Sequence, residues 1–268
     1  MPFTFAHPIF AWPLKRLSPN RLSTTGLVLG SMAPDFEYFL RLEPYRGIGH
    51  TLPGLFVQAI PLSVLFAFAF HGLIKKPLAL HLPSVLRLDA RACSLIGEWR
   101  LRSVRDWFYF FVSIAIGFLT HVAVDGVTHA RGFFASRLPV LRLTAVGHMP
   151  LYQFLQYGLS VLGLAVIAGF FLWRLARCKP DPLGPARVSA GHKVRFWLIT
   201  FAVAAVVVAV KLHAIGSANH LGTVVVAPIS GFILGVTLAS AAARRWMAGG
   251  GTPGKRGDRK SRHAGTAV

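Results

Sequence analysis

The sequence has few charged residues and very few acidic ones. Only 14% of its 268 residues are Asp, Glu, Lys or Arg, and nine of them are acidic. Soluble domains carry about 25% charged residues, so this composition excludes an ordinary soluble globular protein. Because acids are so scarce, each acidic side chain beside an apolar segment is a candidate functional group.

The sequence also lacks the signatures of several protein classes. Its two cysteines, Cys93 and Cys178, are too few for a disulfide framework and lack metal-ligand spacing, so we expect free thiols. There is no GxSxG nucleophile motif, no complete GxxxxGK[ST] loop and no GxGxxG after a strand. These absences exclude serine-hydrolase, P-loop and dinucleotide-binding chemistry. Early prolines interrupt the N-terminus, which does not resemble a cleavable signal peptide.

Long apolar runs are what the chain has instead. Hydrophobic residues make up 54% of it, and the mean hydropathy is +0.55. The runs are continuous rather than alternating, which is typical of helices and not of strands. The sequence therefore predicts an all-α, polytopic membrane protein with five clear transmembrane helices. The expected spans are 54–74, 107–129, 152–173, 196–212 and 221–243.

The basic residues are concentrated in alternate connections between these spans. The net charge is +20, which in a soluble protein would indicate nucleic-acid binding. Here the positive-inside rule explains it better, and we expect no nucleic-acid partner. The rule predicts a multi-pass protein of the bacterial cytoplasmic (inner) membrane, with a cytoplasmic C-terminus and with basic loops and tail on anionic headgroups. Lys and Arg number seven in 75–105, six in 174–195 and seven in 244–262, against two in 41–53 and three in 130–151.

Two N-terminal segments precede the first clear span. Residues 1–21 are aromatic, proline-rich and basic at their end, and predict a short amphipathic segment at the membrane interface. In 22–40, Ser23 is expected to cap a short helix, Gly30 to end it and Pro34 to prevent its continuation. This predicts a short, broken membrane-depth segment; whether it crosses the membrane stays open.

We divide the chain into three parts. Residues 1–175 would form a metal-site membrane domain, and 176–247 a C-terminal segment of two membrane helices. Residues 248–268 are rich in glycine and basic residues, which predicts a disordered tail.

The stretch THVAVDGVTH, residues 120–129, carries the clearest chemical signal. Its residues His121, Asp125 and His129 are spaced at i, i+4 and i+8, about 40° further round the helix at each step, so they project from one face. Two imidazoles flanking a carboxylate form a natural half of a metal site. The simpler interpretation is a helix end whose polar residues reach headgroup water.

Further candidate ligands lie upstream and fall on the same predicted outer side. Neutral His and ionised Asp suit divalent metals, zinc first. Six ligands are too many for one tetrahedral ion and would suffice for two ions bridged by a carboxylate, for which Asp125 is the best placed. Asp35 or Glu37 would be the catalytic base. The candidate metal ligands are His7, Asp35, His50, His121, Asp125 and His129.

Four motifs carry a resemblance to a known family. MPFTFAHP, GSMAPDFEYF, GHTLPG and THVAVDGVTH together resemble a bacterial family of uncharacterised integral membrane proteins, domain-of-unknown-function family 4184, over roughly 1–175. They are also similar to motifs of metal-dependent hydrolases of the inner membrane. The order His, Asp, His, HxxxD is similar to that of zinc-dependent phospholipases C, whose later His and Glu ligands have no match here. The resemblance implies metal ligands at His7, Asp35, His50, His121 and Asp125.

Two functions are compatible with these patterns. The first is a membrane metal-dependent hydrolase acting on phosphoesters at the outer face, with membrane lipid as a possible substrate. The alternative is a non-enzymatic scaffold or small transporter with a polar or metal-binding cluster. A transporter would need polar residues deep in several spans, and the last three spans have few. This favours a site at one edge of the membrane.

Overall fold

The computed structural model describes residues 4–45, 47–181, 188–215 and 220–249. Within these ranges the chain is almost entirely helical, and five helices are long and apolar enough to cross a membrane. The predicted tail, 248–268, lies outside the described residues from 250 onwards. The five spans are Leu52–Leu80, Val104–Thr128, Leu151–Arg177, Ala190–Ala214 and Val224–Trp246, which confirms the predicted fold class.

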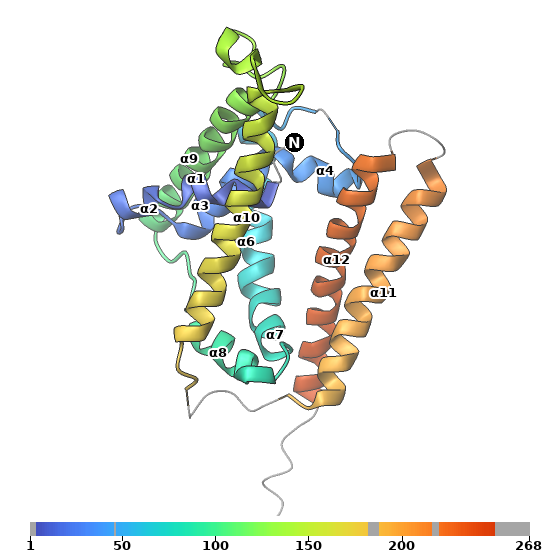
Figure 1. Ribbon diagram of the computed structural model, residues 1–268. Helices are drawn as coiled ribbons and strands as arrows, with labels where there is room; N and C mark the ends of the chain where they lie inside the picture. The colour runs from blue at the N-terminus through green and yellow to red at the C-terminus, as the bar shows by residue number, and fades with distance from the viewer. Residues whose placement is uncertain (1–3, 46, 182–187, 216–219, 250–268) are drawn as a thin grey trace, which may run out of the picture.

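Short helices form the N-terminal part and lie near one end of the long helices (Figure 1). They pack beside α9 and α10 instead of lying apart on a surface: Ala6 and Ala11 are buried, and Trp12 contacts Phe170 edge-on at 4.2 Å between ring centroids. The expected peripheral segment is therefore part of the bundle. The elements are η1 (Thr4–Ala6), α1 (Pro8–Ala11), α2 (Leu14–Leu17), α3 (Thr24–Met32), η2 (Ala33–Asp35) and α4 (Phe36–Arg41).

Helix α3 is capped as predicted but ends later than predicted. The Ser23 hydroxyl accepts a hydrogen bond from the Gly26 backbone N–H. Gly30 does not end the helix, which continues to Met32. Its role is packing, because a Cβ at Gly30 would overlap the Ile114 backbone of α9. Gly26 and Gly30, four residues apart, let the two helix backbones approach closely, as small residues do between membrane helices.

Segment 22–40 is broken at Pro34, as expected. With nine residues, α3 is about 14 Å long and cannot cross a hydrocarbon core of about 30 Å. The turn η2 and the short helix α4 follow and redirect the chain. The segment therefore does not add a sixth span.

The first span is continuous but irregular. It contains α5 (Leu52–Gly54), η3 (Leu55–Ala59), α6 (Ile60–Phe68), η4 (Ala69–Ile74) and α7 (Lys75–Leu80), of which η3 and η4 are π-helical turns. Thr51 caps its beginning by accepting a hydrogen bond from the Gly54 N–H. His50 therefore stands directly before the span, as the sequence indicated.

Two more spans and the connections beside them complete the first part of the chain. The second span is α9 (Val104–Thr128), which begins in a capping box formed by Ser103 and Asp106. It ends one residue before His129, whose backbone is extended. Before it come η5 (Val85–Arg87) and α8 (Leu88–Leu95); after it come η6 (Pro139–Arg142), the hairpin β1 (Thr144–Val146) and β2 (Met149–Pro150), and α10 (Leu151–Arg177).

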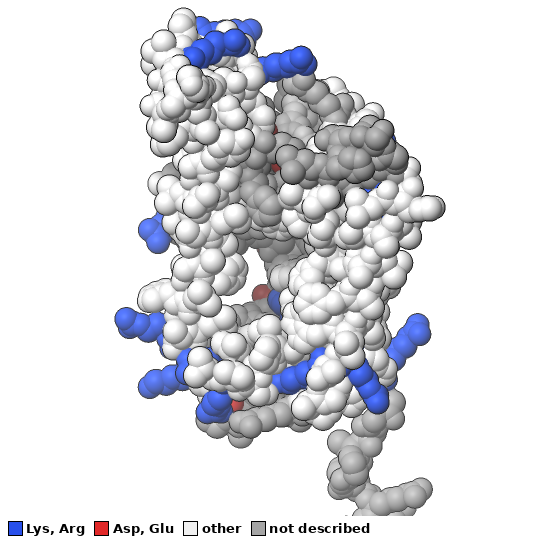
Figure 2. All heavy atoms as spheres, turned by 45° about the vertical axis from the view of Figure 1, so that its right-hand side comes forward, with Lys and Arg blue, Asp and Glu red and all other residues white. Residues whose placement is uncertain are grey.

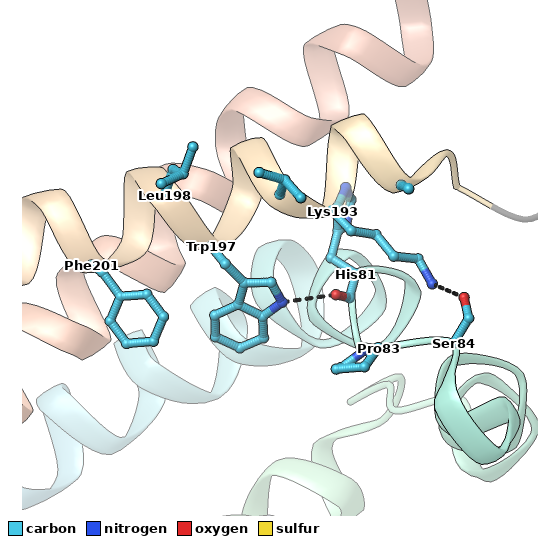
Figure 3. Close-up of a pocket in the computed structure, with 9 residues that line it drawn as sticks. His81, Pro83, Ser84, Lys193, Trp197, Leu198 and Phe201 are labelled. Carbon is cyan, nitrogen blue, oxygen red and sulfur yellow. Dashed lines mark hydrogen bonds between the residues drawn. The ribbon is translucent and has the colours of Figure 1, made fainter.

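The last two helices, α11 (Ala190–Ile215) and α12 (His220–Gly249), pack against each other and join the rest at both ends. At one end the buried Lys193 ammonium lies 2.5 Å from Asp89. Lys193 also donates to Ser84, and Trp197 donates to the His81 carbonyl (Figure 3). At the other end Lys211 pairs with Glu43 of the α4 loop at 3.0 Å.

The basic residues gather at the ends of the bundle. The described parts of connections 75–105 and 174–195 meet at one end, where Arg91 donates to the carbonyls of Leu175, Ala176 and Cys178, and the loop 130–151 lies at the other end (Figure 1). Lys and Arg side chains gather around the first end, with a smaller group at the opposite tip (Figure 2). Long apolar stretches of α10 and α11 are exposed between the ends, for example Phe171, Leu198 and Val206. These features are compatible with a multi-pass membrane protein.

Candidate metal centre

The structure brings all six predicted ligands together at one place in the bundle. We call them the His–Asp cluster. His7 stands between η1 and α1, Asp35 ends η2, and His50 precedes the first span. The other three ligands come from α9 and the residue after it. The six members are His7, Asp35, His50, His121, Asp125 and His129.

Two imidazole nitrogens of the cluster each lie within 4 Å of an oxygen of both carboxylates. His50 Nε2 lies 3.4 Å from Asp35 Oδ1, 3.2 Å from Asp125 Oδ2 and 3.2 Å from His121 Nε2. His121 Nε2 lies 3.8 Å from Asp35 Oδ1 and 3.3 Å from Asp125 Oδ2. Ligands about 2.1 Å from a tetrahedral ion are about 3.4 Å apart, so these separations fit one divalent ion.

The other carboxylate oxygen of Asp125 faces a second group. Its Oδ1 lies 3.6 Å from His7 Nε2 and 3.5 Å from His129 Nδ1. The His7 ring stacks on the His121 ring, with 3.7 Å between centroids. Asp125 therefore has one oxygen toward each group, and its role as a bridge between two ions stays a prediction.

Two polar groups outside the cluster orient its ligands. The Thr4 hydroxyl donates to Asp35 Oδ2 at 2.6 Å, which leaves Oδ1 directed at the histidines. His121 Nδ1 lies 2.7 Å from the Ser31 carbonyl oxygen and, since a carbonyl can only accept, must carry the proton. In the neutral form of His121, Nε2 then presents its lone pair to the cluster. Such outer contacts are typical of metal-binding histidines and carboxylates.

Several cluster atoms are buried without a hydrogen-bond partner. They are both ring nitrogens of His7, Oδ1 of Asp35 and Oδ1 of Asp125. Buried polar atoms are normally paired because an unpaired one costs about 1–3 kcal/mol. Four imidazoles and two carboxylates are a suitable donor set for zinc, iron or manganese. The unpaired atoms and the donor set together fit a divalent metal.

Burial controls the protonation of the cluster residues outside the spans. It lowers the pKa of His7 to about 2, aided by the neighbouring His121 and opposed by the Asp125 charge. Burial likewise lowers the pKa of His129, against the opposing effect of Asp125. Both imidazoles are therefore neutral at physiological pH, which is the form that binds metals. Burial raises the pKa of the Asp35 carboxyl, although nearby histidines and Thr4 act in the opposite direction.

The two candidate catalytic carboxylates lie in different surroundings. Asp35 is buried and faces the cluster, as described. Glu37, on α4, has its Oε1 3.4 Å from Nε of Arg41, and they form an ion pair one helical turn apart. Of the two, Asp35 is the one in contact with the other candidate ligands.

Comparison with known families gives one match. The family model described as Domain of unknown function (DUF4184) matches residues 1–241. The chain belongs to the DUF4184 family. No curated protein and no solved structure matches it. The family match covers the four motifs, the fourth span and most of the last one, so it extends over both parts of the bundle.

A cavity of about 700 Å³ opens beside the cluster of this DUF4184 protein. His50, Asp125 and His129 form part of its wall, so a small molecule in the cavity would contact both groups of ligands. Arg131, in the loop after α9, also lines it. Sequence reasoning missed Arg131, Thr4 and Ser31. No spacing rule in the sequence links these residues to the cluster. The loop after α9 brings Arg131 there, and the packing of the N-terminal helices against the bundle brings Thr4 and Ser31 there.

Proposed function

We propose that the protein is a membrane-embedded, metal-dependent hydrolase of phosphoesters. The observation that carries this proposal is the convergence of four His and two Asp around the two oxygens of Asp125, with buried ligand atoms unpaired. Two close metals are a recurring arrangement for phosphoester hydrolysis. The similarity of the ligand order to membrane hydrolases and to zinc-dependent phospholipases C supports the same chemistry.

The two groups of ligands would hold one or two divalent ions, with zinc favoured by the donor set. Asp35, His50 and His121 would hold one ion together with Asp125, and His7 and His129 would hold a second, also with Asp125. When bound, such ions would lower the pKa of water and neutralise charge on phosphoryl oxygens.

The chain's own residues would orient and protect this site. Thr4 and Ser31 fix the Asp35 carboxylate and the His121 ring, so little reorganisation is needed for binding. The buried rings of His7 and His121 exclude water from one side of Asp125, and the cavity admits substrate from the other. Asp35 would accept the proton of the attacking water, with Glu37 the alternative base.

The proposal places the site at the outer face of a bacterial cytoplasmic membrane. The cluster lies toward the end of α9 away from connections 75–105 and 174–195, which carry most basic residues. The positive-inside rule assigns these connections and the C-terminus to the cytoplasm. There they would contact anionic headgroups, while membrane lipid would reach the site from the outer leaflet.

Metal content of the detergent-purified protein is the test. Inductively coupled plasma mass spectrometry should find one or two zinc ions per chain in the wild type and none in a His121→Ala/Asp125→Ala double variant. His148→Ala is the matched control, because it removes an exposed imidazole of the hairpin loop outside the cluster. The loaded protein should then hydrolyse a generic phosphodiester such as bis(p-nitrophenyl) phosphate.

Two results would contradict the proposal. Wild-type protein without metal after reconstitution with zinc or manganese would leave the cluster as a purely polar assembly. The second result is a wild-type protein that binds metal, a double variant that does not, and no turnover of lipid or soluble phosphoesters by the wild type. That result would favour a scaffold or transporter.

A further inference from the structure

We propose that Arg131 binds a phosphate oxygen of the substrate, and that the substrate is an anionic phosphoester carried on a lipid. This inference rests on the proposed function, because it assigns the reacting group to the His–Asp cluster. It adds what the cluster cannot supply, namely a cation for the substrate's remaining negative charge.

The loop returns tightly onto the end of α9. The backbone N–H groups of Phe134 and Ala135 both donate to the Gly126 carbonyl, at 2.9 and 3.0 Å. Gly132 makes this approach possible, since a Cβ there would overlap the Gly126 backbone. Residue 131 is therefore held beside the cluster by a backbone anchored to the same helix that carries Asp125.

Arg131 differs from the other two arginines of the loop. Arg137 donates to the Phe133 carbonyl and lies over the Phe133 ring at 3.9 Å, and Arg142 donates to the carbonyls of Ala130 and Ala135. These two stabilise the loop. In the described part of the chain Arg131 has no hydrogen-bond acceptor, acidic partner or aromatic ring, yet it lines the cavity. Its guanidinium is free for a ligand.

Among the described residues that line the cavity, Arg131 is the one Lys or Arg. The nearby Arg41 is engaged, because it pairs with Glu37 and lies 3.7 Å over the Tyr45 ring. A guanidinium presents a planar fork of donors that matches two phosphate oxygens, so an anionic phosphate is the ligand class it selects.

The remaining cavity wall favours a lipid over a soluble phosphoester. Tyr38, Tyr45 and Phe133 line it together with the polar residues. Tyrosine side chains, such as those of Tyr38 and Tyr45, are enriched where membrane proteins meet headgroups. The lining residues come from α4 and the connection before the first span, and from the end of α9 with the loop after it. A headgroup could enter there while its acyl chains remain in the bilayer.

The test measures binding of inorganic phosphate to the purified, metal-loaded protein by isothermal titration calorimetry. Arg131→Gln should weaken phosphate binding about tenfold to a hundredfold, the range for a lost charge-assisted pair. Arg131→Lys, which keeps the charge, should lose less. Arg137→Gln, from the same loop but outside the cavity lining, should bind like wild type. All variants should keep the wild-type metal content, which excludes a general loss of structure.

A second arm distinguishes the two sources of phosphate. Competition by phosphatidic acid in mixed micelles is compared with competition by glycerol 3-phosphate, which carries the same monoester without acyl chains. At least tenfold stronger competition by the micellar lipid supports the lipid assignment, and equal competition overturns it.

Other outcomes separate this inference from the proposed function. Equal phosphate binding by Arg131→Gln and wild type, or no phosphate binding by the wild type, overturns the role of Arg131. If phosphate binding depends on Arg131 but no phosphoester is turned over, the proposed phosphate site is supported and the proposed hydrolase activity is rejected.

Discussion

His121 Nε2 lies 3.3 Å from Oδ2 of Asp125, one turn further along the same helix. The contact alone is an ordinary i, i+4 pair. What makes it a candidate metal site is that each residue is also in contact with segments from outside the helix: His121 with Ser31, and Asp125 with His7 and His50. The predictions below test these relationships separately.

Asp125→Asn should remove more metal than loss of any single histidine. Asp125 faces both ligand groups, whereas His129 belongs to the group at Oδ1 only. We expect Asp125→Asn to lose all bound metal and His129→Ala to retain one ion. Metal-to-protein ratios by mass spectrometry measure this, with circular dichroism to confirm intact helices. Stoichiometric metal in Asp125→Asn would reject the bridging role.

Thr4→Val should weaken metal binding without removing a ligand. The Thr4 hydroxyl is the donor that directs Asp35, and loss of such outer contacts costs about tenfold to a hundredfold in affinity. Competition with a zinc chelator measures the change. Thr144→Val, at an exposed position of β1, is the matched control and should keep wild-type affinity. An unchanged affinity in Thr4→Val would show that Asp35 is oriented without it.

Gly30→Ala should destabilise the protein, although alanine favours helices. The new Cβ would overlap the Ile114 backbone and separate α3 from α9, at a cost of about 1–3 kcal/mol. The separation should also weaken metal binding, since the adjacent Ser31 orients His121. Thermal unfolding in detergent measures the first effect. Gly158→Ala on α10 has open space around it and should be neutral or stabilising. Equal effects of the two variants would contradict the close packing.

The ion pair between Asp89 and Lys193 should make stability depend on pH in the acid range. Burial opposes ionisation of Asp89, but hydrogen bonds from Lys193, Ala90 and Ser84 outweigh it and lower the pKa of its carboxyl. A lowered pKa in the folded state stabilises the fold above the ordinary value of 3.8, and this contribution is lost as the pH falls through the folded-state pKa.

Unfolding of Asp89→Asn across pH 7 to 3 tests this dependence. At pH 7 the variant should be less stable than wild type by about 3–5 kcal/mol, because Lys193 is left buried and unpaired. The difference should shrink below about pH 4. Glu98→Gln, which removes an exposed pair with Arg100, should change stability little at any pH. A difference that is independent of pH would contradict the ion pair.

Cysteine labelling tests the proposed sidedness. In a background lacking Cys93 and Cys178, Thr144→Cys should react with a membrane-impermeant maleimide in intact spheroplasts. Glu98→Cys should react only after lysis, because connection 75–105 is assigned to the cytoplasm. Both positions are exposed, so access to reagent depends on the side of the membrane. The reverse pattern would place the cluster on the cytoplasmic face.

Hydropathy was sufficient to predict the spans, and spacing was sufficient to predict that His121 and Asp125 lie together. Apolar runs long enough to cross a membrane, in a chain with so few acidic residues, leave few structures other than transmembrane helices. The i, i+4 spacing places His121 and Asp125 on the same face of their helix. The distant ligands His7, Asp35 and His50 were suggested by residue type and predicted side. Their separations from Asp125 are properties of the folded bundle.

Other features depend on packing that sequence patterns do not encode. Gly30 was predicted to end a helix because glycine often stands at helix ends. In the structure Gly30 lies inside α3, where the close contact with the Ile114 backbone leaves no room for a Cβ. The π-helical turns of the first span leave the apolar run unchanged, so hydropathy cannot detect them. Arg131 resembles any loop arginine until the loop's hydrogen bonds show which of the three is free.

The distribution of the ligands along the chain has a consequence for biogenesis. His7 and Asp35 precede the first span, His50 directly adjoins it, and the remaining ligands lie at the far end of the second. The site cannot form until α9 has been inserted and the N-terminal helices have packed against it. If the cluster binds metal as proposed, metal uptake would follow the completion of the first two spans. A chain truncated before α9 would carry half of the candidate ligands and would lack Asp125.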